Sequence, residues 1–479
     1  MSTPPATTIT TKPQDGKQQH QQRPSSSSST RPPKKPKSQP PITQAISSWL
    51  DTLPPTLLLL SQPLTHSSPP PPPPPPASLD NLKSTLLSTS PRRFATYPPL
   101  LLLPSGSFSS PAWTALLSLV SHEQSTALYE SILSKFSSSS SSSSGEGGVM
   151  THLAINSGIP PLTSSSFLSS DNTTRDGEGQ EKKEKEENVL RSPTNLVPLY
   201  GPDFDRLWVS TKQNGLTQTW APAHTMFSRG NVKEKARVLG FEPPATAASH
   251  KEMVVVDLYA GIGYFVFSYA KLGFKVLGWE INAYSVQGLV RGAVANKFSV
   301  RVVNGDEKKE KGGLEKKDAS ASAAASAGAA AGLDDKGGEE GNDDQGGEQI
   351  IVFEESNVHA VRRIKEMRLG KKGERVKHVN CGFLPTSEPV WRDAVEIVRT
   401  GWDEDDDNNN NNNKEEEGWL HLHENVGVED IDKRKKEVEG MLSGWVGEGA
   451  GVEVEHVELV KTYAPGVWHV VFDVRVWRG

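Results

Sequence analysis

Runs of apolar residues divide the C-terminal half of the chain into alternating strands and helices. The predicted strands are short and rich in β-branched residues: 253–257, 274–279, 299–304 or 350–353, 376–383 and 418–423. A helix near 429–445 leads to a final strand pair at 452–461 and 467–476. Parallel strands that end in an antiparallel pair predict a doubly wound α/β sheet, which we expect to occupy residues 223–479.

Upstream of this sheet, the pattern predicts a smaller α+β module over residues 79–222. Two strand-like runs, Leu207–Thr211 and Leu216–Trp220, flank the pair Asn214-Gly215. An Asn-Gly pair between two such runs favours a tight β-hairpin turn. If the chain acts on a nucleic acid, this module is a candidate for binding it.

Much of the remaining chain is too polar to form a core, since only 34% of the residues are hydrophobic. Residues 1–78 are predicted to be a disordered Pro/Ser-rich basic tail, and 306–348 and 403–417 to be disordered insertions. Without residues 1–47, 171–188 and the two insertions, the net charge is +4 rather than the total of −6. The acidic total therefore does not exclude a nucleic-acid partner.

The cysteine count and hydropathy narrow the class further. The single Cys381 excludes an internal disulfide and any multi-thiolate zinc site, which suits a reducing compartment. No apolar run approaches the length of a membrane span, and the N-terminus lacks a secretory apolar core. We expect a cytoplasmic protein with no membrane contact, and nothing in the sequence indicates a stable protein partner.

The stretch MVVVDLYAGIGYFVFSYAKLGFKVLGWE carries the clearest chemistry. A strand ends at Asp257, a loop carries Gly261 and Gly263, and a second strand closes on Glu280. This order of elements is typical of sites that bind a nucleoside-containing cofactor. The glycines let the backbone approach the ligand, and the acid accepts hydrogen bonds from the ribose hydroxyls. A dinucleotide fingerprint would need glycine at Val266, so S-adenosylmethionine fits better than NAD. Asp257 can hold the loop or meet the cationic methionine end of the cofactor. The alternative interpretation of the whole stretch is an ordinary α/β core strand followed by a tight turn.

The segment HVNCGFLPTSEPVW follows the next predicted strand, so Asn380, Pro385 and Ser387 should lie at the same edge of the sheet. In methyltransferases that act on bases, the loop in this place often presents an Asn and a Pro to a planar acceptor. An ordinary Asn/Pro turn is the alternative interpretation.

The segment HLHENV ends the following strand. Alternation points His421 and His423 to one face and leaves Glu424 and Asn425 at the mouth of the site. Two histidines and a glutamate can indicate a metal, but no third ligand cluster is evident, and we predict a site without metal. His423 or Glu424 could instead move a proton or fix the substrate.

The segment TMFSRGNVKEKAR lies just before the α/β domain. Arg229, Lys235 and Arg237 cluster near a predicted helix start that Ser228 can cap. Basic groups beside free N–H groups suit a carboxylate or a phosphate. A solvated basic helix face is the alternative.

In this order, the segments FSRGNVKEKAR, DLYAGIGYF, HVNCGFLPTSEPVW, LHLHENV and YAPGVWHVVFDV resemble the fungal-type tRNA wybutosine-synthesizing protein 2 family. This family is related to the tRNA guanine-37 N1-methyltransferases, and the resemblance covers roughly residues 195–479. It implies a class I S-adenosylmethionine-dependent methyltransferase-like fold. It also implies transfer of the 3-amino-3-carboxypropyl group of S-adenosylmethionine to carbon 7 of 4-demethylwyosine, at position 37 in the anticodon loop of phenylalanine tRNA.

The resemblance also assigns roles by position. The cofactor contacts it implies are Ser228, Lys235, Glu280 and Asn357, to which the glycine motif adds Asp257, Gly261 and Gly263. We expect Glu424, Asn425 and Asn380 at the reacting centre, and Arg229, Arg237, Pro385, Ser387 and His423 to contact the tRNA substrate. The chain departs from the family at Glu354–Asn357, where Gly-Asp-Asn is usual, so the acidic contact there is displaced or lost.

A sulfonium activates all three attached carbons, so the protein selects the product by the carbon that it turns toward the acceptor. Our hypothesis is that Ser228 and Lys235 hold the methionine carboxylate so that the γ-carbon meets the base, with Glu424 accepting the released ring proton. Methyl transfer to guanine 37 is the alternative within the superfamily. A non-catalytic RNA-binding scaffold is the alternative of another class.

Overall fold

The computed structural model describes residues 39–60, 79–137, 149–156, 196–244, 253–305, 348–369, 374–400, 402 and 416–478. The predicted disordered segments therefore lie largely outside the described residues. The exceptions are 39–60 in the predicted tail, and residues 348 and 416–417 at the ends of the two predicted insertions.

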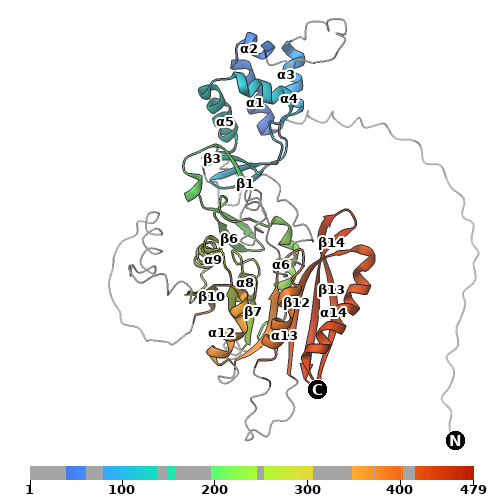
Figure 1. The fold of residues 1–479 in the computed structure, drawn as a ribbon. Helices are drawn as coiled ribbons and strands as arrows, with labels where there is room; N and C mark the ends of the chain where they lie inside the picture. The colour runs from blue at the N-terminus through green and yellow to red at the C-terminus, as the bar shows by residue number, and fades with distance from the viewer. Residues whose placement is uncertain are drawn as a thin grey trace, which may run out of the picture. The chain divides into compact units, whose positions relative to one another are not determined.

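The C-terminal domain is built on an eight-stranded sheet in the order β13-β14-β12-β11-β7-β8-β10-β9 (Figure 1). Its strands are β7 (Met253–Asp257), β8 (Lys275–Trp279), β9 (Val300–Asn304), β10 (Ile350–Glu354), β11 (Arg375–Cys381), β12 (Glu416–Gly427), β13 (Ala450–Ala464) and β14 (Val467–Arg478). Strands β12 through β9 run parallel, whereas β14 is antiparallel to both of its neighbours. The predicted doubly wound α/β class is confirmed, and both candidates for the third strand form, as β9 and β10.

Helices cover both faces of this sheet, which explains why its central strands are continuous apolar runs. On one face lie α6 (Val232–Val238), α8 (Val266–Lys271) and α9 (Ala283–Ala295). The other face carries α12 (Ala360–Met367), α13 (Trp391–Val398) and α14 (Ile431–Val446). In β7, Val255 joins the first core, and Val254 and Val256 join the second. Asp257 is the last residue of β7 and therefore lies at the carboxyl end of a central strand.

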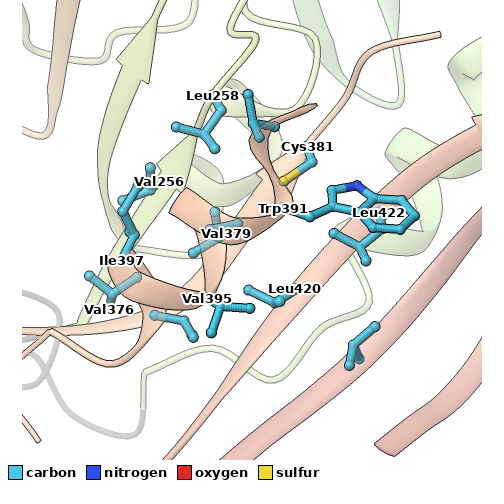
Figure 2. Packing of buried hydrophobic residues seen from close by; sticks show 14 of the residues in the cluster. Val256, Leu258, Val376, Val379, Cys381, Trp391, Val395, Ile397, Leu420 and Leu422 are labelled. Atoms are coloured by element: carbon cyan, nitrogen blue, oxygen red, sulfur yellow. The ribbon is translucent and has the colours of Figure 1, made fainter. Parts of the chain in front are cut away.

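The core under α13 shows how closely the helix is fixed to the sheet. Figure 2 shows Trp391 and Val395 of α13 beside Val379 of β11 and Leu420 and Leu422 of β12. These side chains are at most 2% exposed. The loop between β11 and α13, which carries the predicted acceptor segment, is therefore anchored by packing at both ends.

The N-terminal module contains a four-stranded sheet in the order β1-β2-β3-β4. Its strands are β1 (Ala95–Tyr97), β2 (Leu100–Leu103), β3 (His152–Asn156) and β4 (Leu196–Tyr200), and its helices are α1 (Pro41–Thr52), α2 (Pro55–Leu60), α3 (Leu79–Ser88), α4 (Pro111–Leu119) and α5 (His122–Ser137). Among the described strands of this sheet, β2 and β3 pair in parallel and the other neighbours pair antiparallel. The α+β character of this module is as expected from the sequence.

The start of this module differs from the expected boundary at residue 79. Helix α1 buries Ile42, Ile46, Trp49 and Leu50, an apolar stripe at helical spacing. These side chains share one core with α4 and α5. Because Pro/Ser-rich sequence surrounds this short amphipathic segment, the composition of the region did not predict it.

The hairpin of β5 (Val209–Gln213) and β6 (Leu216–Trp220) forms with its turn at Asn214-Gly215, as predicted. It packs on α9 of the C-terminal domain: Asn296 accepts from the Thr217 N–H and donates to the Thr217 carbonyl, at 2.8 and 2.7 Å. The expected domain boundary at residue 222 therefore divides elements that pack together. No helix among the described residues is long and apolar enough to cross a membrane.

Candidate cofactor and acceptor site

The loop after β7 is shaped by two glycines and one carboxylate. Gly261 and Gly263 have φ values of +55° and +89°, and a Cβ at Gly263 would lie 2.5 Å from the Phe267 ring. Asp257 Oδ1 accepts from the Tyr259 N–H and from Asn380 Nδ2, both at 3.1 Å. Its Oδ2 has no partner among the described residues. Burial raises the pKa of Asp257 to about 6. The hydrogen bonds of its Oδ1 hold the loop.

Glu280 lies at the end of β8, next to this loop. One carboxylate oxygen accepts from the Gly261 N–H at 2.9 Å, and the other accepts from the Asn282 N–H at 2.8 Å. Burial raises the pKa of Glu280 to about 7. The two backbone contacts fix the carboxylate beside the glycine loop, and its remaining lone pairs suit ribose hydroxyl groups.

The end of β10 supplies an amide rather than an acid. Asn357 Nδ2 donates to the Leu258 carbonyl at 2.9 Å, which ties this turn to the cofactor loop. The nearby Glu355 is buried and pairs with Arg363 at 2.8 Å, so it is engaged away from a ligand. Ile281 and Val358, which directly follow Glu280 and Asn357, are 38% and 65% exposed. Exposed apolar side chains in these positions suit the faces of a planar ring.

Lys235 of α6 is a buried cation without a carboxylate partner among the described residues. Lys235 is only 3% exposed. Its Nζ donates to Gln213 Oε1 and Gln218 Oε1, at 2.5 and 2.7 Å. The ammonium also lies 5.5 Å from the ring centres of Phe227 and Tyr264. Burial lowers the pKa of Lys235 to about 7. Neutral oxygens and rings hold the ammonium but leave its charge unbalanced.

Ser228 precedes the short 3₁₀ helix η3 (Arg229–Asn231) and is joined to the cofactor loop by Tyr264. The Ser228 N–H donates to the Tyr264 hydroxyl at 2.9 Å, and that hydroxyl donates to the Met226 carbonyl at 2.6 Å. The same Tyr264 ring contacts the Lys235 ammonium. One side chain of the glycine loop therefore positions both residues that were expected to hold the methionine carboxylate.

The two arginines of this segment have different surroundings. Arg229 is exposed, as a residue that meets a polyanion should be. Arg237 instead binds two buried carboxylates, Glu234 at 2.6 Å and Asp473 of β14 at 2.5 Å. Its guanidinium also lies 5.0 Å from the Phe241 ring. These contacts join α6 to the sheet, so the expected tRNA contact of Arg237 does not match its position.

The acceptor loop is rigid at its base. Asn380 is 1% exposed and donates to Asp257, which links the two strand ends. The Pro385 carbonyl accepts from the Asn425 N–H at 2.7 Å. Ser387 is fully buried; its hydroxyl donates to the His423 carbonyl and accepts from Trp391 Nε1, at 3.0 and 2.9 Å. Ser387 therefore supports the loop. Because its hydroxyl is buried and bonded within the protein, it does not lie where the expected contact with substrate would require it.

Glu424 and Asn425, the two residues at the end of β12 that were expected to react, have different surroundings. Glu424 is held by Arg434 of α14, with Nε and a terminal nitrogen at 2.9 and 3.0 Å from its two oxygens. Arg434 also binds Glu388. Both carboxylate oxygens of Glu424 are thus occupied by Arg434, which weighs against Glu424 as the base. Both amide atoms of Asn425 are buried without a partner among the described residues.

His423 is part of a line of buried imidazoles on the α6 and α8 face of the sheet. Its Nδ1 lies 3.0 Å from Nε2 of His469, and farther along, His378 Nδ1 lies 3.1 Å from His421 Nε2. His421 Nδ1 lies 2.7 Å from Asp473. Burial lowers the pKa of His423 well below 6.5. Among the described residues, no group of three His, Cys, Asp or Glu side chains is placed to hold a metal ion.

Several residues of this site carry no signal that the sequence could reveal. Gln213 and Gln218 reach Lys235 only because the hairpin folds back over α6. Tyr264 lies in the glycine motif, but its bond to the Met226 carbonyl spans 38 positions. Arg434 lies on a helix with a charged surface, where nothing distinguishes it from its neighbours.

Comparison with known proteins shows the family to which the chain belongs. Residues 210–318 match the model described as the TRM5/TYW2 methyltransferase domain. The chain is 32% identical over 400 residues to tRNA wybutosine-synthesizing protein 2 of Schizosaccharomyces pombe, covering 80% of this chain and 72% of the relative. It is 29% identical over 436 residues to the Saccharomyces cerevisiae protein of that name, covering 82% and 76%. The solved structure of P. horikoshii TYW2 in complex with MeSAdo is 17% identical with a TM-score of 0.44, covering 83% of this chain and 95% of that chain. The chain therefore belongs to the tRNA wybutosine-synthesizing protein 2 family, whose members are S-adenosylmethionine-dependent transferases that modify tRNA.

Proposed function

We propose that the chain transfers the 3-amino-3-carboxypropyl group of S-adenosylmethionine to carbon 7 of 4-demethylwyosine at position 37 of phenylalanine tRNA. Carbon 7 attacks the γ-carbon of the methionine arm, and the bond from that carbon to sulfur breaks. Sulfur keeps the electron pair and leaves as methylthioadenosine, while the ring loses its proton to water and regains aromaticity. The atoms balance without a further reactant.

The observation that carries the proposal is the buried ammonium of Lys235. Its Nζ is surrounded by the amide oxygens of Gln213 and Gln218 and by aromatic rings, and no carboxylate among the described residues pairs with it. Binding of the methionine carboxylate would supply the missing charge. A carboxylate held at this depth turns the γ-carbon, rather than the methyl group, toward the acceptor.

The other contacts divide the cofactor into recognisable parts. Glu280 takes the ribose hydroxyls, Ile281 and Val358 take the adenine faces, and the Gly261–Gly263 loop takes the backbone contact. The acceptor base enters between the Asn380–Pro385 loop and the end of β12, which carries Asn425. Arg229, exposed at the start of η3, meets the tRNA backbone. The cellular compartment in this proposal is the cytoplasm, where the protein would meet mature tRNA.

Replacement of Lys235 by Met tests the proposal. The Lys235→Met variant should bind methylthioadenosine, which has no carboxylate, with unchanged affinity, but should bind S-adenosylmethionine much more weakly and transfer no aminocarboxypropyl group. Lys233→Met is the matched control, because Lys233 lies on the same helix with its side chain 65% exposed. Full aminocarboxypropyl transfer by a folded Lys235→Met variant would contradict the proposal.

A further inference from the structure

Aromatic side chains connect the N-terminal module with the cofactor site. Tyr97 of β1 is 7% exposed, and its ring meets those of Trp220 and Phe227 edge-on, with ring centres 4.9 and 5.7 Å apart. Phe227 in turn stacks on Trp220 at 4.2 Å and on Tyr264 of the glycine loop at 6.2 Å. The Lys235 ammonium lies 5.5 Å from the ring centres of both Phe227 and Tyr264. A single ring, that of Phe227, therefore lies between Tyr97 and this ammonium.

These rings belong to a hydrophobic core that both parts of the chain share. Tyr97 is clustered with Leu100 of β2, with Val209 and Trp220 of the hairpin, and with Ile262 of the glycine loop. These five side chains are at most 7% exposed. The core of the N-terminal module therefore continues, across the expected boundary at residue 222, to the loop that shapes the cofactor site.

The position of the Phe227 ring depends on its aromatic neighbours. Residues 225–228 form neither a helix nor a strand, so packing rather than regular secondary structure fixes the direction of this side chain. Trp220 lies against one face of the ring and Tyr97 meets its edge. Removal of the Tyr97 ring opens space at that edge. Phe227 can then shift, together with the adjacent Ser228, which was expected to contact the methionine carboxylate.

A ring held beside the Lys235 ammonium favours the binding of a carboxylate in two ways. The face of the ring attracts the cation and holds it in place. The ring also excludes water, which would otherwise screen the attraction between the ammonium and a carboxylate. Both effects decrease when the Phe227 ring moves away. A ligand without a carboxylate gains nothing from either effect.

We propose that Tyr97, although it lies in the N-terminal module, is a positioning residue of the cofactor site. It acts through Phe227, which it holds against Lys235, and it thereby strengthens the binding of a cofactor that carries a carboxylate arm. This inference rests on the proposed function, because it assumes that Lys235 binds the methionine carboxylate. It gives the N-terminal module a role in cofactor binding in addition to the expected role in binding tRNA.

The test compares variants of the full-length protein by the ratio of the Kd for methylthioadenosine to the Kd for S-adenosylmethionine. Tyr97→Ala removes the ring, whereas Tyr97→Phe removes only the hydroxyl group. Leu100→Ala is the matched control, because Leu100 is fully buried in the same core and its truncation leaves every aromatic ring in place. Isothermal titration calorimetry measures both Kd values for each variant, and thermal unfolding measures its stability.

We expect Tyr97→Ala to lower this ratio at least about fivefold, because the binding of S-adenosylmethionine weakens more than that of methylthioadenosine. Tyr97→Phe should match wild type for both ligands, and Leu100→Ala should lower the unfolding temperature but keep the wild-type ratio. A folded Tyr97→Ala variant with the wild-type ratio would overturn the proposal, whether both affinities are unchanged or both fall equally. An equal loss of both marks a residue that only supports the fold.

A second variant covers the case in which Tyr97→Ala does not fold. Tyr97→Leu keeps an apolar side chain in the core and must lower the same ratio, or the proposal fails. Lys235→Met separates this inference from the proposed function: a lowered ratio in Lys235→Met beside the wild-type ratio in the Tyr97 variants refutes the role of Tyr97 alone. If the wild-type protein transfers methyl groups while the Tyr97 variants still lower the ratio, the role of Tyr97 stands and the proposed function fails.

Discussion

Affinity for S-adenosylmethionine should fall as the pH rises above 7, because the Lys235 ammonium that binds its carboxylate loses its proton. Burial among two amide oxygens and two rings lowers the pKa of Lys235 from 10.5 to about 7. A bound carboxylate favours the ammonium form, so the pKa of Lys235 rises in the complex. Binding above pH 7 therefore takes up a proton, and the affinity decreases with pH until the pKa of the complex is reached.

The structure sets the size of this effect. With a pKa of about 7, half of Lys235 is charged at pH 7 and about one part in a hundred at pH 9. The affinity should therefore fall by about 50-fold over these two pH units, which corresponds to about 2.3 kcal/mol. Asp257 and Glu280, with pKa values of about 6 and 7, are largely ionised over most of this range. Their titration opposes the decrease only near pH 7.

Isothermal titration calorimetry at pH 7, 8 and 9, in buffers of different ionisation enthalpy, measures both the affinity and the proton uptake. Lys235→Arg is the control, because a guanidinium keeps its charge over this range. Its residual pH dependence reports the titration of the ligand's own amine, which is subtracted. Methylthioadenosine, without a carboxylate, should bind with little dependence on pH. The reasoning is refuted if wild type and Lys235→Arg show the same slope.

Three further predictions concern the fold. Gly263→Ala should destabilise the protein by about 2–4 kcal/mol more than Gly447→Ala, since both have positive φ but only the former meets a ring, at 2.5 Å; denaturant unfolding should show this difference, and equal losses would leave strain alone as the cause. Arg237→Met should cost about 3–5 kcal/mol, because it leaves the buried carboxylate of Glu234 unpaired and leaves Asp473 with His421 alone, while the remaining folded protein should bind tRNA normally in filter-binding assays. Trp49→Ala should cost about 3–5 kcal/mol in thermal unfolding, because this side chain is 3% exposed in a shared core; an unchanged transition would mean that α1 does not pack there.

The parts of the site that are local in sequence could be predicted. The strand, the glycine loop and Glu280 lie within one short stretch, and their geometry follows from the right-handed connection between parallel strands. The carboxyl-end rule for such sheets then selects Asn380 and the end of β12. Asp257 and Asn380 meet in the structure, at 3.1 Å, as neighbouring parallel strands require.

The parts that depend on distant partners could not be predicted. Arg237 and Lys235 are two residues apart in a basic helix, and the sequence offers no reason to treat them differently. Arg237 meets Asp473, which lies 236 positions away, whereas Lys235 meets two glutamines of a hairpin. The same charge is thus structural at one position and available at the other. Glu424 likewise lies against Arg434 of α14, a contact that the sequence does not show.

Nucleoside mass spectrometry of the wild-type reaction tests the central claim most directly. The enzyme is incubated with S-adenosylmethionine and phenylalanine tRNA carrying 4-demethylwyosine, and the digested nucleosides and small-molecule products are analysed together. Our account predicts that the modified base gains one aminocarboxypropyl group and that methylthioadenosine forms in equal amount. Gain of a methyl group with formation of S-adenosylhomocysteine would contradict it.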